Sequence, residues 1–201
     1  MYYVGLDLGQ RRDHTALAVV EKAIRYSSSV GSGASILHLR YVERVSLGTS
    51  YPAVVARVRE VVTDAELAGQ CCLAVDATGL GAPVVQMLRA ARLGCDIAAV
   101  TMTGGEKESQ RGNDFNVPKR DLVAGVQVLL EQGGLRIART LEGARSLIEE
   151  LVNVRTTVRV NGRVRLGADG CGAHDDLVIA LALACWKARM KRKSGPPIPW
   201  G

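Results

Sequence analysis

The chain has 201 residues, enough for one domain with a buried core or at most two small ones. Hydrophobic residues make up 47% and charged residues 23%, which excludes a low-complexity chain, and its apolar runs are too short to span a membrane. The net charge of +6 leans modestly toward a polyanionic partner such as nucleic acid.

Three strands are predicted at the start of the chain, over 2–8, 14–21 and 36–47. The first two are joined by the tight turn "GQRRD", and the polar stretch 26–35 before the third is expected to be a loop. The third stretch alternates apolar and polar residues, which is typical of a half-exposed strand. Together they predict an antiparallel meander.

Helices and strands alternate in the middle of the chain. The apolar spacing predicts an amphipathic helix over 51–68, and the continuous apolar run "CCLAVD" at 71–76 predicts a strand covered on both faces. A helix over 79–94 and a buried strand over 95–103 follow. This alternation favours parallel pairing of the strands.

The last third begins with a segment, 104–116, that has no periodic pattern and is predicted to be a mobile loop. A helix is predicted over 117–134, because Pro118 fits its first turn and Gly133 its end. The remaining predicted elements are a strand (135–138), a helix (140–154), a hairpin around Asn161 and Gly162 (155–166) and a final amphipathic helix (174–191).

These elements predict one α/β domain over residues 1–191, followed by a basic, proline-rich, disordered tail over 192–201. The expected core is a mixed five-stranded sheet, three antiparallel strands and then parallel strands, with helices on both faces and an added β-hairpin.

Cysteine usage indicates the cellular compartment. The cysteines are odd in number and form no C-x-x-C pair, which predicts reduced thiols in a cytoplasmic protein and neither a disulfide framework nor a zinc site. They are Cys71, Cys72, Cys95, Cys171 and Cys185. No signal peptide or membrane association is expected.

Acidic residues fall at the ends of three predicted elements. Asp7 ends the apolar first strand, where a buried carboxylate is costly unless it is paired. Asp76 ends the strand over 71–76, and Asp175 and Asp176 lie in the first turn of the last helix. Ligands of open α/β sheets bind at such strand ends, so we expect these carboxylates to share one crevice.

Clustered carboxylates need a compensating charge, since two charges 4 Å apart repel by about 4 kcal/mol at an effective dielectric of 20. Oxygen-only ligands favour Mg²⁺ or Mn²⁺, and two such ions can drive phosphodiester cleavage. Without metal, like-charge repulsion is expected to raise the carboxylate pKa values. A plain structural reading stays open for Asp76 as a turn residue and for Asp175 and Asp176 at a helix start.

Four segments resemble the nuclease domain of tailed-phage terminase large subunits, which has a ribonuclease H-like (resolvase/integrase) fold: "GLDLGQRRDHTALAVV", "LAVDATGLGAPVVQML", "VPKRDLVAGVQVLLEQGGLRI" and "HDDLVIALALA". The resemblance implies a two-metal (Mg²⁺ or Mn²⁺) endonuclease that cuts concatemeric phage DNA in a bacterial host. Asp7, Asp76 and one of Asp175 and Asp176 would be its catalytic, metal-binding carboxylates. A packaging ATPase, a small terminase subunit and the portal are the partners it implies.

Further residues are candidates for auxiliary roles. Asp13 is a fourth acid near the metals, while His174 and Lys119 are candidates for contacting phosphate, although a turn, a cap or a solvated side chain explains each of them as well. The basic residues expected to bind DNA are Lys107, Arg111, Arg159, Arg163 and Arg165. Aromatic residues are only 4%, which favours binding to the backbone of duplex DNA.

One feature of complete terminase large subunits is missing, because the sequence has no G-x-x-x-x-G-K-[ST] motif for a packaging ATPase. We therefore expect either an excised nuclease domain or a stand-alone relative. Three alternatives remain open: a Holliday-junction resolvase of the same fold, an actin-like ATPase or sugar kinase fragment, and an idle DNA-binding module. The actin-like reading rests on the first strand–turn–strand, but no second "D-x-G-G" phosphate loop follows.

Overall fold

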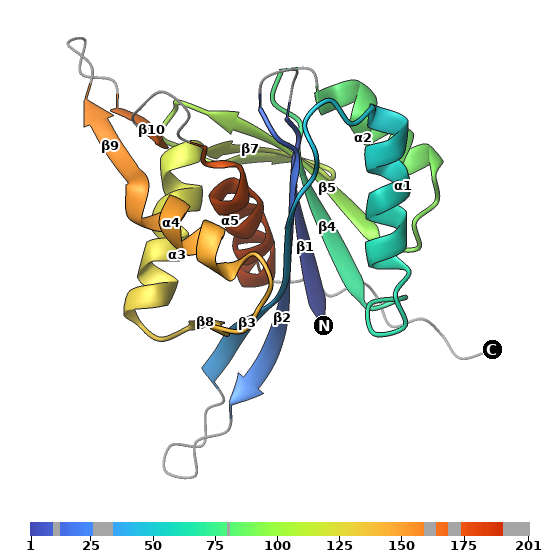
Figure 1. The fold of residues 1–201 in the computed structure, drawn as a ribbon. Helices are drawn as coiled ribbons and strands as arrows, with labels where there is room; N and C mark the ends of the chain where they lie inside the picture. The colour runs from blue at the N-terminus through green and yellow to red at the C-terminus, as the bar shows by residue number, and fades with distance from the viewer. Residues whose placement is uncertain (10–12, 26–33, 80, 159–163, 169–173, 191–201) are drawn as a thin grey trace.

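The computed structural model describes residues 1–9, 13–25, 34–79, 81–158, 164–168 and 174–190, and the predicted tail over 192–201 lies outside these ranges. A mixed sheet forms its centre, with the strand order β6-β7-β5-β4-β1-β2-β3-β8 (Figure 1). The strands are β1 (Tyr2–Asp7), β2 (Ala16–Arg25), β3 (Ala34–Arg44), β4 (Cys71–Asp76), β5 (Asp96–Thr103), β6 (Ser109–Arg111), β7 (Asp114–Pro118) and β8 (Leu135–Ile137).

The five central strands confirm the predicted sheet. β1, β2 and β3 form the antiparallel meander, while β4 lies parallel to β1 and β5 parallel to β4. The predicted hairpin is also confirmed, as a separate two-stranded sheet of β9 (Val154–Val158) and β10 (Val164–Ala168).

The sheet is wider than predicted, because β6, β7 and β8 extend it to eight strands. The prediction of a mobile loop over 104–116 is wrong, since β7 pairs with β5 and β6 folds back onto β7. The buried residues of β7 are Phe115, Val117 and Pro118, and the exposed polar residues Asp114 and Asn116 leave too short an alternation to recognise in the sequence. The helix that was predicted from residue 117 begins at Lys119, because β7 extends to Pro118.

Helices cover both faces of the sheet. α1 (Tyr51–Val62) and α2 (Gly81–Ala90) lie on one face, and α3 (Lys119–Glu131), α4 (Ala144–Asn153) and α5 (Asp176–Arg189) lie on the other (Figure 1). The pleat of β1 divides its side chains between two cores: Val4 and Leu6 pack toward α1 and α2, and Tyr3 packs on the side of α5. In the described ranges, none of the helices combines the length and apolarity needed to cross a membrane.

The prediction that the last helix is amphipathic is wrong. α5 is buried without a break from Asp176 to Cys185, because it lies between the sheet and the helices α3 and α4. Its alanines let it approach the sheet closely, and a Cβ at Gly5 of β1 would collide with the backbone of Ala180 and Ala184. Gly5 is therefore the point at which the strand carrying Asp7 meets the helix carrying Asp176.

We expect Gly5→Ala to destabilise the fold by at least about 3 kcal/mol, because the added methyl group meets helix backbone that cannot rotate away. Gly104→Ala is the matched control, since a Cβ there meets nothing within 4 Å. Urea unfolding of both variants measures the difference. Equal stability of the two would show that α5 does not pack against β1 at this position.

Candidate active site

The carboxyl ends of β1 and β4 bring two acids side by side. The parallel register pairs Leu6 with Val75, so the next position pairs Asp7 with Asp76. Their carboxyl groups lie close enough to influence each other, and burial raises the pKa of both, with the charge of Asp76 raising that of Asp7 further.

The turn after β4 holds Asp76 in place. Its Oδ1 accepts a hydrogen bond from the backbone N–H of Thr78 at 2.8 Å, and the Thr78 hydroxyl accepts one from the N–H of Met102 at 2.8 Å. A Cβ at Gly81 would stand 2.5 Å from the Asp76 carbonyl oxygen, so α2 begins directly against this strand end. The buried Asp76 carboxylate is thus fixed by a local turn anchored to β5.

The start of α5 adds two more acids. Asp175 is the N-cap residue and Asp176 the first helical residue. Lys119, at the start of α3, donates a hydrogen bond from Nζ to Asp175 Oδ2 at 2.7 Å. Burial raises the pKa of both Asp7 and Asp76, and the charge of the same lysine partly offsets that rise, so it belongs to the same group of charges.

The acids perturb one another electrostatically. Burial raises the pKa of Asp7 well above its ordinary value, and the charges of Asp76, Asp176 and Asp175 raise it further. Burial also raises the pKa of Asp76 and of Asp176. The predicted direction is confirmed, but the largest cause is loss of hydration and not like-charge repulsion.

The structure places Glu150 and Arg44 beside this cluster, and neither was predicted from the sequence. Glu150 of α4 is buried, and burial raises its pKa to about 7. It is joined to Arg44 of β3, whose Nε lies 3.9 Å from Asp176 Oδ2. One signal was available: Glu150 follows Leu147 by three residues and so falls on the buried side of its helix.

The auxiliary candidates lie at different distances from the acids. His174 Nδ1 is 3.6 Å from Asp176 Oδ2, and its ring meets that of His14 edge-on, with centroids 5.2 Å apart. His14 was not predicted as a site residue; a ring nitrogen of it lies 3.1 Å from the Val45 carbonyl oxygen. Asp13 is exposed in the turn before β2.

The predicted DNA-binding residues are only partly described. Lys107 and Arg111 are exposed, Arg111 on the edge strand β6. Arg165 lies in β10, opposite Thr157 of β9. Arg159 and Arg163 lie outside the described residues.

The donors at this site suit a hard divalent cation. They are carboxylate oxygens, and within the described part of the chain the buried Asp176 Oδ2 has no hydrogen-bond donor. Among the described residues, no three His, Cys, Asp or Glu side chains converge on one point as they stand. Asp175 is paired with Lys119, so for Asp175 to bind an ion its carboxylate must leave that ion pair.

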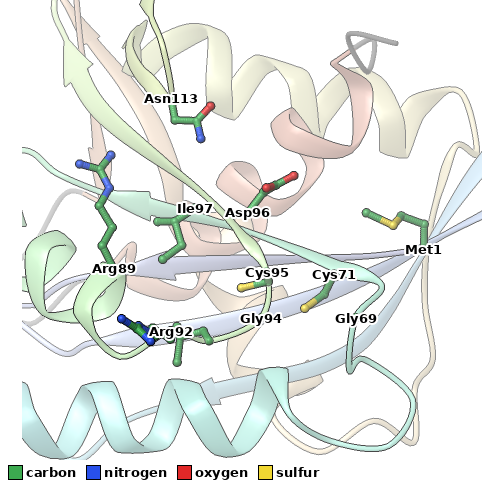
Figure 2. A pocket seen from close by; sticks show the side chains of 11 residues that line it. Met1, Gly69, Cys71, Arg89, Arg92, Gly94, Cys95, Asp96, Ile97 and Asn113 are labelled. Atoms are coloured by element: carbon green, nitrogen blue, oxygen red, sulfur yellow. The ribbon is translucent and has the colours of Figure 1, made fainter. Parts of the chain in front are cut away.

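A cavity of about 550 Å³ lies at the other end of the strands (Figure 2). Cys71 and Cys95 lie side by side in its lining, and their shared hydrogen bond, together with burial, raises the pKa of Cys95. Since a strand rises about 3.3 Å per residue, Cys71 at the first position of β4 is roughly 16 Å from Asp76 at the last. The cavity is therefore separate from the acids.

No family model and no curated protein sequence matches the chain, but solved structures do. The large terminase nuclease from thermophilic phage G20c with bound magnesium is similar, at 23% identity and a TM-score of 0.64, over 93% of this chain and 81% of that one. The nuclease domain of the large terminase subunit of bacterial virus Sf6, with manganese and beta-thujaplicinol, is similar at 14% identity and a TM-score of 0.60, over 92% and 87%. The HK97 bacteriophage large terminase is similar at 17% identity and a TM-score of 0.56, over 92% of this chain and 38% of that one.

These likenesses confirm the fold predicted from the motifs. The chain has the ribonuclease H-like fold that terminase nuclease domains share.

The raised pKa values predict that the metal-free protein loses stability as the pH rises from about 5 to 8. The folded protein binds more protons than the unfolded chain between the ordinary carboxyl pKa near 4 and the raised values, one of which is about 7 for Glu150. The stability that these acids contribute is therefore fully present below their unfolded pKa and is lost as the pH rises through their folded pKa. Urea unfolding in the presence of a chelator measures this slope, and Asp7→Asn is expected to flatten it. Stability that stays constant or rises over this range would contradict the prediction.

Proposed function

We propose that this chain is a metal-dependent DNA endonuclease that hydrolyses phosphodiester bonds of duplex DNA. One observation carries the proposal: the fold gathers Asp7, Asp76, Asp175 and Asp176 where β1 and β4 end and α5 begins. The likeness to nuclease domains solved with magnesium or manganese supports it.

The acids would hold two Mg²⁺ or Mn²⁺ ions. Asp7, Asp76 and one or both of Asp175 and Asp176 would supply the oxygen ligands, and bound ions would activate water and stabilise the leaving oxygen. Burial raises the pKa of Asp7 and Asp76, and only ionised carboxylates act as ligands, so cation binding would compete with protons. Lys119 would compensate charge while no ion is bound and would be available to a phosphate afterwards.

Duplex DNA is the proposed substrate. The net charge of +6 favours a polyanion, Lys107 and Arg111 are exposed, and Arg111 lies on β6 opposite Asp114, the first residue of β7. Arg159, Arg163 and Arg165 of the hairpin region would add contacts with the backbone. His174 and Asp13 remain proposed auxiliary residues, and His174 Nδ1 lies 3.6 Å from Asp176 Oδ2.

The biological setting is proposed from the resemblance. The chain would cut concatemeric phage DNA in the cytoplasm of a bacterial host, alongside a packaging ATPase, a small terminase subunit and a portal. It matches 38% of the length of the HK97 large terminase, so activities of such a whole protein are not assigned to this chain.

We expect Asp7→Asn and Asp76→Asn each to lower Mn²⁺-dependent plasmid cleavage to below about 1% of the wild-type rate, because loss of a direct ligand costs at least as much as loss of its supporting residues. DNA binding in a gel-shift assay should persist. Asp96→Asn is the matched control, since Asp96 is exposed at the opposite end of the sheet. Near-normal cleavage by either active-site variant would overturn the role of that residue.

Assays with a four-way junction, with ATP in the absence of DNA, and of DNA binding separate the alternatives. Preferential cutting of a four-way junction over plasmid would favour the Holliday-junction resolvase. ATP turnover without DNA would favour the actin-like reading. DNA binding without cleavage in Mg²⁺ or Mn²⁺ would favour the idle binding module.

A further inference from the structure

The first turn of α5 is capped by a side chain from another helix. Glu150 of α4 is buried, and its Oε2 accepts hydrogen bonds from the backbone N–H groups of Leu177 at 3.0 Å and Val178 at 3.2 Å. The first N–H groups of a helix have no partner inside the helix, and the residue before the helix usually satisfies them. Here the acceptor comes from 27 positions earlier in the chain.

The residue at the usual capping position is left free for other contacts. Asp175 is the N-cap of α5, yet within the described residues its carboxylate makes no capping hydrogen bond and instead accepts one from Lys119. Asp176 Oδ2 likewise has no hydrogen-bond donor in the described part of the chain. Within the described residues, the Asp175 carboxylate and Asp176 Oδ2 therefore accept no hydrogen bond from the backbone of α5.

Arg44 holds Glu150 in this position. Its Nη2 donates to Glu150 Oε1, which leaves Oε2 for the two amides of α5. The same guanidinium lies near Asp176, with Nε and Oδ2 3.9 Å apart. One cation on β3 therefore lies between two buried carboxylates and compensates both, which a buried acid requires.

We propose that Glu150 is a positioning residue for the acids of α5: by capping the helix in place of Asp175, it leaves the Asp175 and Asp176 carboxylates available to a divalent cation. This inference rests on the proposed function and adds to it a residue that contacts neither metal nor DNA. Without Glu150, two buried N–H groups lose their acceptor. Asp175 is then the nearest carboxylate able to replace it, and capping would draw Asp175 out of the metal site.

Calorimetric titration of the metal-free protein with Mn²⁺ tests the role directly. We expect Glu150→Ala to weaken Mn²⁺ binding by about tenfold or more, and Glu150→Gln to weaken it less, because the amide keeps an acceptor oxygen but loses the charge that pairs with Arg44. Glu149→Ala, an exposed neighbour on the same helix, should leave binding unchanged. Leu147→Ala, buried in the core beside the same helix turn, should lower the thermal midpoint but keep wild-type affinity well below that midpoint.

Amide exchange of the metal-free protein tests the cap independently of any metal. We expect the Leu177 and Val178 amides to exchange faster in both Glu150 variants and to keep wild-type rates in Glu149→Ala. Failure of the wild-type protein to bind Mn²⁺ would overturn the proposed metal site. The positioning role would be overturned if both Glu150 variants bound Mn²⁺ with wild-type affinity. It would also be overturned if neither variant changed the exchange rates of the Leu177 and Val178 amides. An equal loss of affinity in Leu147→Ala would also overturn it, because general destabilisation would then explain the effect.

Discussion

The close packing of α5 on β1 is the constraint on which the candidate site depends. Asp7 ends the strand and Asp176 begins the helix, so the distance between the two elements sets the distance between the acids. Gly5 and the alanines of α5 allow that approach, and the helix is buried on the sheet side and on the side of α3 and α4. A looser contact would move Asp176 away from Asp7, and the Asp176 charge would then add less to the rise in the Asp7 pKa that burial causes.

Such packing concentrates negative charge in a place with little water, and the protein compensates it from two sides. Lys119 pairs with Asp175 on one side, and Arg44 lies between Glu150 and Asp176 on the other. Between them, burial raises the pKa of Asp7 and Asp76, which favours their neutral forms while no cation is bound. A bound cation could replace the partly exposed Lys119 beside Asp175, or a proton on Asp7 or Asp76. Arg44, in contrast, is paired with the buried Glu150 and stays in place.

The sequence predicted the parts of this arrangement that depend on local pattern. The strand 71–76 was predicted with its observed bounds, because an unbroken apolar run between polar turns has few other readings. Asp7 and Asp76 were identified because they end apolar strands, and Asp175 and Asp176 because they lie in the first turn of the last helix. The sequence could not reveal β7, since so short a strand is defined only by its pairing with β5. Glu150 was missed because its role depends on a helix that follows 26 residues later.

The "HDD" motif at the start of α5 has a role that its sequence leaves open and that the structure narrows. An aspartate before a helix can cap the helix or bind a ligand, and the sequence is the same in either case. The structure separates them by accounting for the helix amides: Leu177 and Val178 donate to Glu150, so capping does not explain Asp175. The Asp175 carboxylate is instead paired with Lys119, and under the proposed function a bound cation would take the place of that lysine.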